Sequence, residues 1–112
     1  MRINKTNTVE CNFTSRHFAE PLSTKVFTTV HVLKENSPIV CVVHELDGDW
    51  QFMGAEPIEQ FINTAKIVTL NDIILHDATV LEVAELPAGY CATRNSRTEK
   101  WVMSKMDFEQ YD

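Results

Sequence analysis

The segment from Ile39 to Met53 constrains the fold more than any other part of the chain. An apolar run, Ile39 to Leu46, is followed by Asp47-Gly48 and then by the apolar-aromatic run Trp50 to Met53. Glycine takes a positive φ at no steric cost, so Asp-Gly between two such runs is a strong signal for a β-hairpin. The first run is apolar on both faces at its start, which indicates an interior strand of a sheet.

Three further segments have the character of strands. Lys25 to Leu33 is rich in β-branched and aromatic residues, and Lys66 to Leu70 is a shorter candidate. Residues 90–95 and 100–103 are predicted to form a closing hairpin across residues 96–99. Near the N-terminus, residues 9–13 alternate weakly, as an edge strand does.

Helices are predicted between these strands. Apolar residues recur at i, i+3, i+4 and i+7 after Pro57, which is the spacing of one buried helical face, at Ile58, Phe61, Ile62 and Ala65. Asn71 and Asp77 are candidate N-caps of short helices over about 72–76 and 78–84.

Together these elements predict an α+β fold, a mostly antiparallel sheet with a few short helices packed on one face. The length of 112 residues fits a single domain over 1–112. Within it, 1–24 is predicted to be a peripheral edge strand or arm, and 107–112 a frayed tail.

Charge is unevenly distributed along the chain. The net charge is −6, but residues 35–92 carry ten acids against the single base Lys66. Acidic surfaces repel phosphates, so the sequence predicts no nucleic-acid partner. The longest strongly apolar stretch is short, and the polar first residues predict no signal peptide. The three cysteines are an odd number and are widely spaced. These features favour reduced thiols and a cytoplasmic protein with no membrane partner.

No motif predicts catalysis or a resident ion. Cys41 and His44 are three positions apart on a predicted strand, so they should point to opposite faces and cannot form a dyad. The four histidines lack the close spacing of a zinc site, although His31 and His44 fall on adjacent predicted strands. We therefore expect no catalytic residue, no metal site and no cofactor.

The acids near the hairpin support the sharpest functional hypothesis. Beside an aromatic residue they would form a patch of one sign that attracts a basic protein partner. The predicted partner-binding residues are Glu45, Asp47, Asp49, Trp50, Glu56 and Glu59. The alternative is that Trp50 is a core residue and the acids provide solubility. Arg94, Arg97 and Lys100 form a basic group that could accept an anion, but pairing with acids on the next strand is favoured.

Four segments together also resemble a known family. They are Ile39–Val43, Asp47–Phe52, Ile67–Ile73, and Leu86–Gly89 followed by Arg94 and Trp101. Across Pro38 to Met103 the chain resembles a bacterial family first described as a domain of unknown function and later proposed as immunity proteins of polymorphic toxin systems. Members carry a longer acidic insert after the tryptophan strand, where this chain has only Gly54-Ala55-Glu56.

The resemblance implies stoichiometric docking on a toxin, without chemistry, and an acidic immunity protein would suit a basic toxin such as a nuclease. Two alternatives remain open. One is a homo-oligomeric structural or accessory domain that uses its apolar strand faces. The other is a small enzyme, which would need a deep pocket around a histidine or cysteine.

Overall fold

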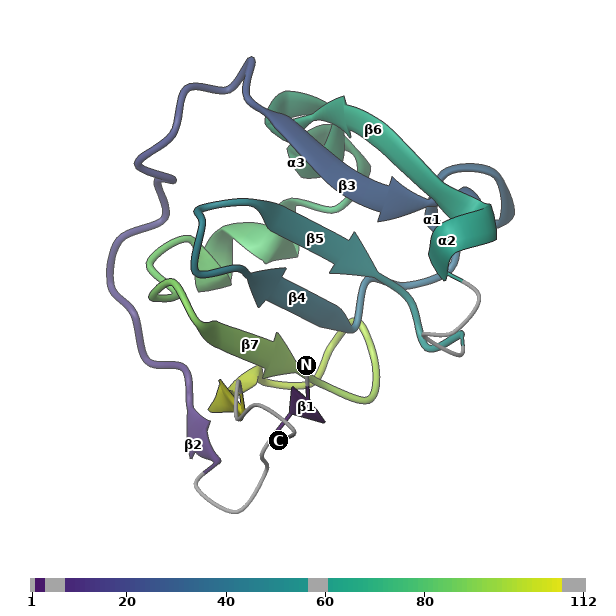
Figure 1. Cartoon of the computed structure of the whole chain (residues 1–112). Helices are drawn as coiled ribbons and strands as arrows, with labels where there is room; N and C mark the ends of the chain where they lie inside the picture. Colours follow the sequence, from purple (N-terminus) through teal and green to yellow (C-terminus); the bar gives the residue numbers. More distant parts are fainter. Residues whose placement is uncertain (1, 4–7, 57–60, 108–112) are drawn as a thin grey trace, which may run out of the picture.

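A computed structural model describes residues 2–3, 8–56 and 61–107 of the chain, and these residues form one eight-stranded sheet with short helices (Figure 1). The elements are β1 (Arg2–Ile3), β2 (Val9–Glu10), β3 (Lys25–Thr29), α1 (Val30–Glu35), β4 (Cys41–His44), β5 (Trp50–Met53), α2 (Phe61–Thr64), β6 (Ala65–Thr69), α3 (Leu70–His76), the 3-10 helix η2 (Ala78–Val83), β7 (Tyr90–Thr93) and β8 (Val102–Asp107). The strand order is β1-β8-β7-β4-β5-β3-β6, and β2 also pairs with β8. All pairs are antiparallel except β3 with β5. The predicted α+β fold with a mostly antiparallel sheet is confirmed.

The central hairpin forms where the sequence places it. Strands β4 and β5 pair from Cys41 opposite Met53 to His44 opposite Trp50. Gly48 has φ 99° in the turn, a conformation that a residue with a Cβ rarely adopts. Strand β4 pairs with β7 on its other edge, so its interior position is also confirmed.

The core lies mainly on the sheet face that the helices cover. It joins Val42 and Phe52 of the sheet to Ile73 of α3 and Val80 of η2, all with no exposed surface. In Figure 1, α3 and the helical turn of η2 lie behind the sheet. Burying each such side chain contributes roughly 1.5–3 kcal/mol, which holds the helices on this face. A smaller cluster around Val43 occupies the opposite face.

The strand predicted over Lys25 to Leu33 is wrong in its second half. The strand ends at Thr29, whose backbone is extended and whose hydroxyl accepts a hydrogen bond from the Val32 amide at 3.3 Å. Helix α1 follows, ends at Glu35 and is capped by Asn36, which has φ 56°. The β-branched residues of this segment favour a strand, but the threonine N-cap and the complete burial of Val32 outweigh that preference.

The other helices differ from the predictions in their boundaries. Helix α3 is capped by Thr69 in a capping box with Asp72, not by Asn71. Asp77 caps η2 as predicted, accepting a hydrogen bond from the Thr79 amide. The helix predicted after Pro57 lies partly outside the described residues. Its last predicted member, Ala65, belongs to β6 instead.

The N-terminal segment forms an arm along the ends of the central strands. After β2, residues 11–24 run past these strand ends without helix or strand (Figure 1). The Cys11 amide donates to the Trp101 carbonyl at 3.0 Å, and the side chains of Phe13 and Phe18 pack against the core. The closing hairpin of β7 and β8 is confirmed. The predicted frayed tail lies outside the described residues except for Asp107, which ends β8.

Candidate functional site

The structure separates the residues that the sequence grouped into one acidic patch. Glu45, Asp47 and Asp49 lie together in the turn between β4 and β5. Glu56 follows the far end of β5, where its carboxylate accepts a hydrogen bond from Ser37 at 2.8 Å. Glu59 lies outside the described residues. The patch therefore reduces to the three acids of the turn.

This turn, residues 45–49, holds three acidic side chains close together. The amide of Glu45 donates to the Asp49 carbonyl at 2.8 Å, and the Asp49 amide donates to the Asp47 carboxylate at 3.0 Å. Partial burial of Glu45, together with the charges of Asp47 and Asp49, raises the pKa of its carboxyl group. The turn is therefore a place where an incoming positive charge would relieve repulsion.

Trp50 is a core residue, so it cannot be the exposed partner-binding residue that the sequence predicted. It is 1% exposed, lies stacked on His44 with ring centroids 3.9 Å apart, and donates its indole N–H to Glu20 at 2.9 Å. The exposed apolar residue of the turn is Leu46, at 63%. The sequence predicted Leu46 as the last residue of the strand. Its place directly before Asp47-Gly48 could have identified it as an exposed turn residue.

His44 belongs to the same buried contact that fixes the arm. Its Nδ1 donates to the Leu86 carbonyl at 2.7 Å, and its Nε2 lies 3.8 Å from a Glu20 oxygen. A cavity of about 380 Å³ adjoins this pair. Cys41 packs against the cluster on the other face of the sheet, so the prediction that Cys41 and His44 point to opposite faces is confirmed.

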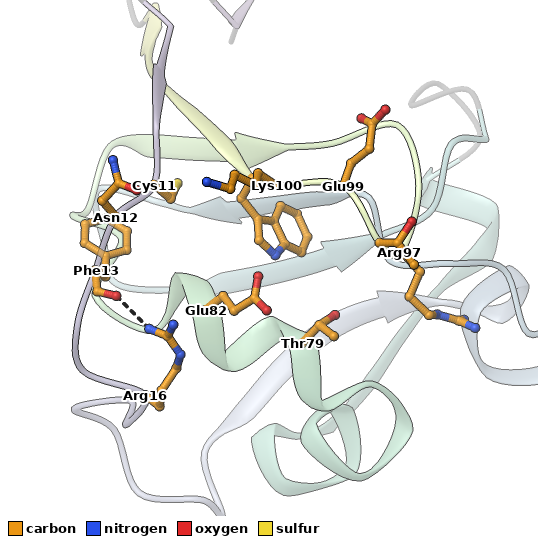
Figure 2. A pocket seen from close by; sticks show the side chains of 11 residues that line it. Cys11, Asn12, Phe13, Arg16, Thr79, Glu82, Arg97, Glu99 and Lys100 are labelled. Atoms are coloured by element: carbon orange, nitrogen blue, oxygen red, sulfur yellow. Dashed lines mark hydrogen bonds between the residues drawn. The ribbon is translucent and has the colours of Figure 1, made fainter.

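A larger cavity, of about 640 Å³, lies between the arm and the loop before β8 (Figure 2). Its lining carries both signs of charge: Arg16 and Lys100 are basic, and Glu82 is acidic. Cys11 also lines it, but burial raises the pKa of this thiol to about 11. A thiol that stays protonated is the opposite of an activated nucleophile.

The basic group near the last hairpin is largely a structural network. Arg94, with its side chain 1% exposed, donates to Asp77 at 3.2 Å and lies 4.0 Å from the Trp101 ring centroid. Arg97 lies 3.6 Å from the same Asp77 carboxylate. The favoured pairing of these arginines with an acid is confirmed, but the acid caps η2 and is not on the next strand. Burial lowers the pKa of Arg94, while Asp77 opposes that shift.

The histidines are not arranged as the predicted strands implied. His31 lies on α1 and does not face His44 across the sheet. Instead its ring lies with the carboxylates of Glu35 and Glu56, and their nearest ligand atoms are all within 4.8 Å of one another. The contact with Glu35, followed by a smaller effect of Glu56, raises the pKa of His31. Sequence spacing could suggest Glu35, one helical turn away, but not Glu56.

No protein-family model, curated protein or solved structure matches the chain. The resemblance to the immunity family therefore stays a prediction. Within the part of the chain that the structure describes, no helix has both the length and the apolar character needed to cross a bilayer.

Proposed function

We propose that this domain is a non-catalytic binding module that docks on a basic protein through the turn between β4 and β5. The observation that carries the proposal is the composition of that turn. Leu46 is 63% exposed and stands among the three carboxylates of Glu45, Asp47 and Asp49. An apolar side chain inside a charged rim matches the apolar centre and polar rim of a protein interface, in which the surrounding charges select the partner.

Electrostatics favour a basic partner over other classes. The chain has a net charge of −6, so the three acids of the turn add to an overall negative field that speeds the approach of positive surfaces. Burial raises the pKa of Glu45, and the charges of Asp47 and Asp49 raise it further. A partner's lysines or arginines would relieve this second, repulsive contribution. Neutralisation of a basic toxin by an immunity-type protein fits this mode, because docked carboxylates occupy the surface that otherwise contacts phosphate.

Affinity capture from the native host tests the proposal. Immobilised wild-type protein should retain a basic protein in a one-to-one complex, and the triple variant Glu45→Gln, Asp47→Asn, Asp49→Asn should lose it. A matched control, Glu10→Gln, Glu85→Gln, Glu99→Gln, removes the same charge from exposed positions elsewhere. Equal retention by all three proteins, or equal loss in both variants, would remove the turn from the interface.

A second candidate function is self-association through β6. This strand ends the sheet, and Ile67 on it is 64% exposed, so it offers an edge for pairing with a second copy. The exposed Leu75 of α3, at 77%, lies on the element that follows. Sedimentation over a concentration series, with Ile67→Lys as the disrupting variant, separates the candidates. If the wild-type protein is a monomer at micromolar concentration, self-association through β6 is excluded.

A further inference from the structure

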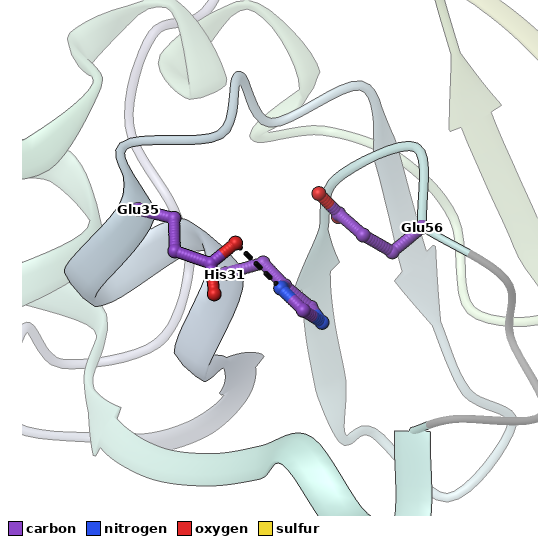
Figure 3. A group of neighbouring side chains, drawn as sticks. All are labelled: His31, Glu35 and Glu56. Atoms are coloured by element: carbon purple, nitrogen blue, oxygen red, sulfur yellow. Dashed lines mark hydrogen bonds and ion pairs between the residues drawn. The ribbon is translucent and has the colours of Figure 1, made fainter.

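We infer that His31, Glu35 and Glu56 form a binding site for a divalent transition-metal ion, with zinc as the best-fitting ion. His31 and Glu35 lie one turn apart on α1, with Nδ1 and Oε1 2.9 Å apart, and Glu56 approaches from the segment after β5 (Figure 3). One ligand atom from each residue lies within 4.8 Å of the other two. Among the described residues this is the one group of three such ligands.

One carboxylate oxygen of the cluster has no partner within the described part of the protein. Glu56 Oε2 accepts the Ser37 hydroxyl, but Glu56 Oε1 is buried and has no hydrogen-bond partner among the described residues. A buried carboxylate oxygen without a donor is unfavourable, so each such atom needs an explanation. A bound cation would give Glu56 Oε1 its partner.

The surrounding chain holds Glu56 in this position. Helix α1 is capped by Asn36, and the Ser37 amide then donates to the His31 carbonyl at 3.0 Å, which places the Ser37 hydroxyl under the Glu56 carboxylate. A Cβ at Gly54 would lie 2.5 Å from Glu56 Oε1 and 3.2 Å from the Ser37 Cβ, so glycine lets the carboxylate lie against the backbone. Contacts of this kind orient ligands in metal sites.

The ligand types select the ion. One imidazole nitrogen with two carboxylate oxygens suits zinc, whereas magnesium and calcium prefer oxygen ligands alone. Zinc–ligand distances near 2.1 Å place tetrahedral ligands about 3.4 Å apart. His31 Nδ1 and Glu35 Oε1, now 2.9 Å apart, would therefore separate by about 0.5 Å, and the wider separations, which are all within 4.8 Å, would close to about 3.4 Å. The ion would replace the proton that His31 Nδ1 shares with Glu35, and that proton would leave to solvent. Two carboxylates balance its charge.

Calorimetric titration of the chelator-treated, dialysed protein with zinc chloride tests the site. We expect one equivalent to bind. His31→Gln and Glu56→Gln should each lower the affinity by about 100-fold or more, and Ser37→Ala by roughly 10–100-fold. Glu56→Gln keeps an acceptor for Ser37, so it should preserve the fold, and circular dichroism checks this. The controls His17→Ala and Glu45→Gln, both away from the cluster, should bind zinc as the wild type does.

Cobalt substitution distinguishes this site from binding by the cysteines. Cobalt bound by nitrogen and oxygen gives visible d–d bands without thiolate charge-transfer bands, and excess magnesium should not displace it. Unchanged zinc affinity in both His31→Gln and Glu56→Gln, thiolate bands with cobalt, or the lack of saturable zinc binding would each overturn the inference. None of these outcomes depends on the turn between β4 and β5. The metal site and docking through the turn are therefore tested independently.

Discussion

Replacement of Arg94 by methionine should be among the most destabilising single changes in this domain. The guanidinium donates twice to the Ile39 carbonyl, at 3.0 and 2.8 Å, and once each to Asp77 and Thr79, at 3.2 and 2.9 Å. It also donates to the Arg97 carbonyl at 2.9 Å. Methionine keeps most of the apolar volume but removes every one of these donors.

The expected magnitude follows from what is left behind. Asp77, with its side chain 3% exposed, would keep a buried charge whose remaining cationic neighbour is the exposed Arg97, 3.6 Å away. Breaking a buried pair costs about 3–5 kcal/mol, and Arg97 offsets part of that cost. Loss of the cation–π contact with Trp101 adds up to about 2 kcal/mol, although the two effects overlap. Domains of this size have total stabilities of about 5–15 kcal/mol, so the variant would be marginally folded.

Urea unfolding with a double-mutant cycle measures this effect. Asp77→Asn removes the charge and can keep the cap through its side-chain oxygen, so Arg94→Met in that background should cost roughly 2–3 kcal/mol less than in the wild type. Arg97→Met, at the exposed arginine of the network, should cost under about 1 kcal/mol. A loss below about 1 kcal/mol for Arg94→Met, or strict additivity with Asp77→Asn, would refute the reasoning.

Three further predictions concern the arm, a helix cap and a thiol. Glu20→Ala should lower the free energy of unfolding by about 1–3 kcal/mol and expose 11–24 to proteolysis, because the buried Trp50 N–H loses its acceptor; an unchanged cleavage rate would contradict this. Hydrogen bonds from Thr69 lower the pKa of Asp72, so its contribution is complete above the unfolded pKa and is lost as pH falls through the folded one. The stability difference between wild type and Asp72→Ala should therefore shrink below about pH 4, and a pH-independent difference would speak against the cap. Because burial raises the pKa of Cys11 from 9.0 to about 11, its alkylation by iodoacetamide at pH 8 should be about 100-fold slower than that of a free thiol, and labelling at the free-thiol rate would be inconsistent with the burial.

The sequence predicts best where local chemistry and the core agree. Asp47-Gly48 requires a turn, the flanking runs require burial, and strand β5 appears at Trp50–Met53 as predicted. It predicts poorly where one side chain redirects the backbone. Thr29 caps a helix inside a β-branched segment, and the burial of Val32, which decides the outcome, depends on distant parts of the fold.

The candidate site shows the same limit. The turn acids were predicted because they are neighbours in sequence, but Trp50 was wrong as a surface anchor because its burial depends on Glu20 and Phe18 of the arm. Glu56 was grouped with the turn although β5 carries it to the other end of the hairpin. Its proximity to His31, within 4.8 Å between ligand atoms, brings together two segments that neither periodicity nor spacing connects.

Docking through the turn between β4 and β5 is tested most directly by the association rate with the captured partner. Stopped-flow rates over a range of salt concentrations would compare the wild type, the turn variant and the matched charge control. We predict that the wild-type rate falls steeply with salt, that Glu45→Gln, Asp47→Asn, Asp49→Asn lowers both the low-salt rate and the salt dependence, and that the control keeps the wild-type slope more closely. Identical slopes for wild type and turn variant would contradict the account.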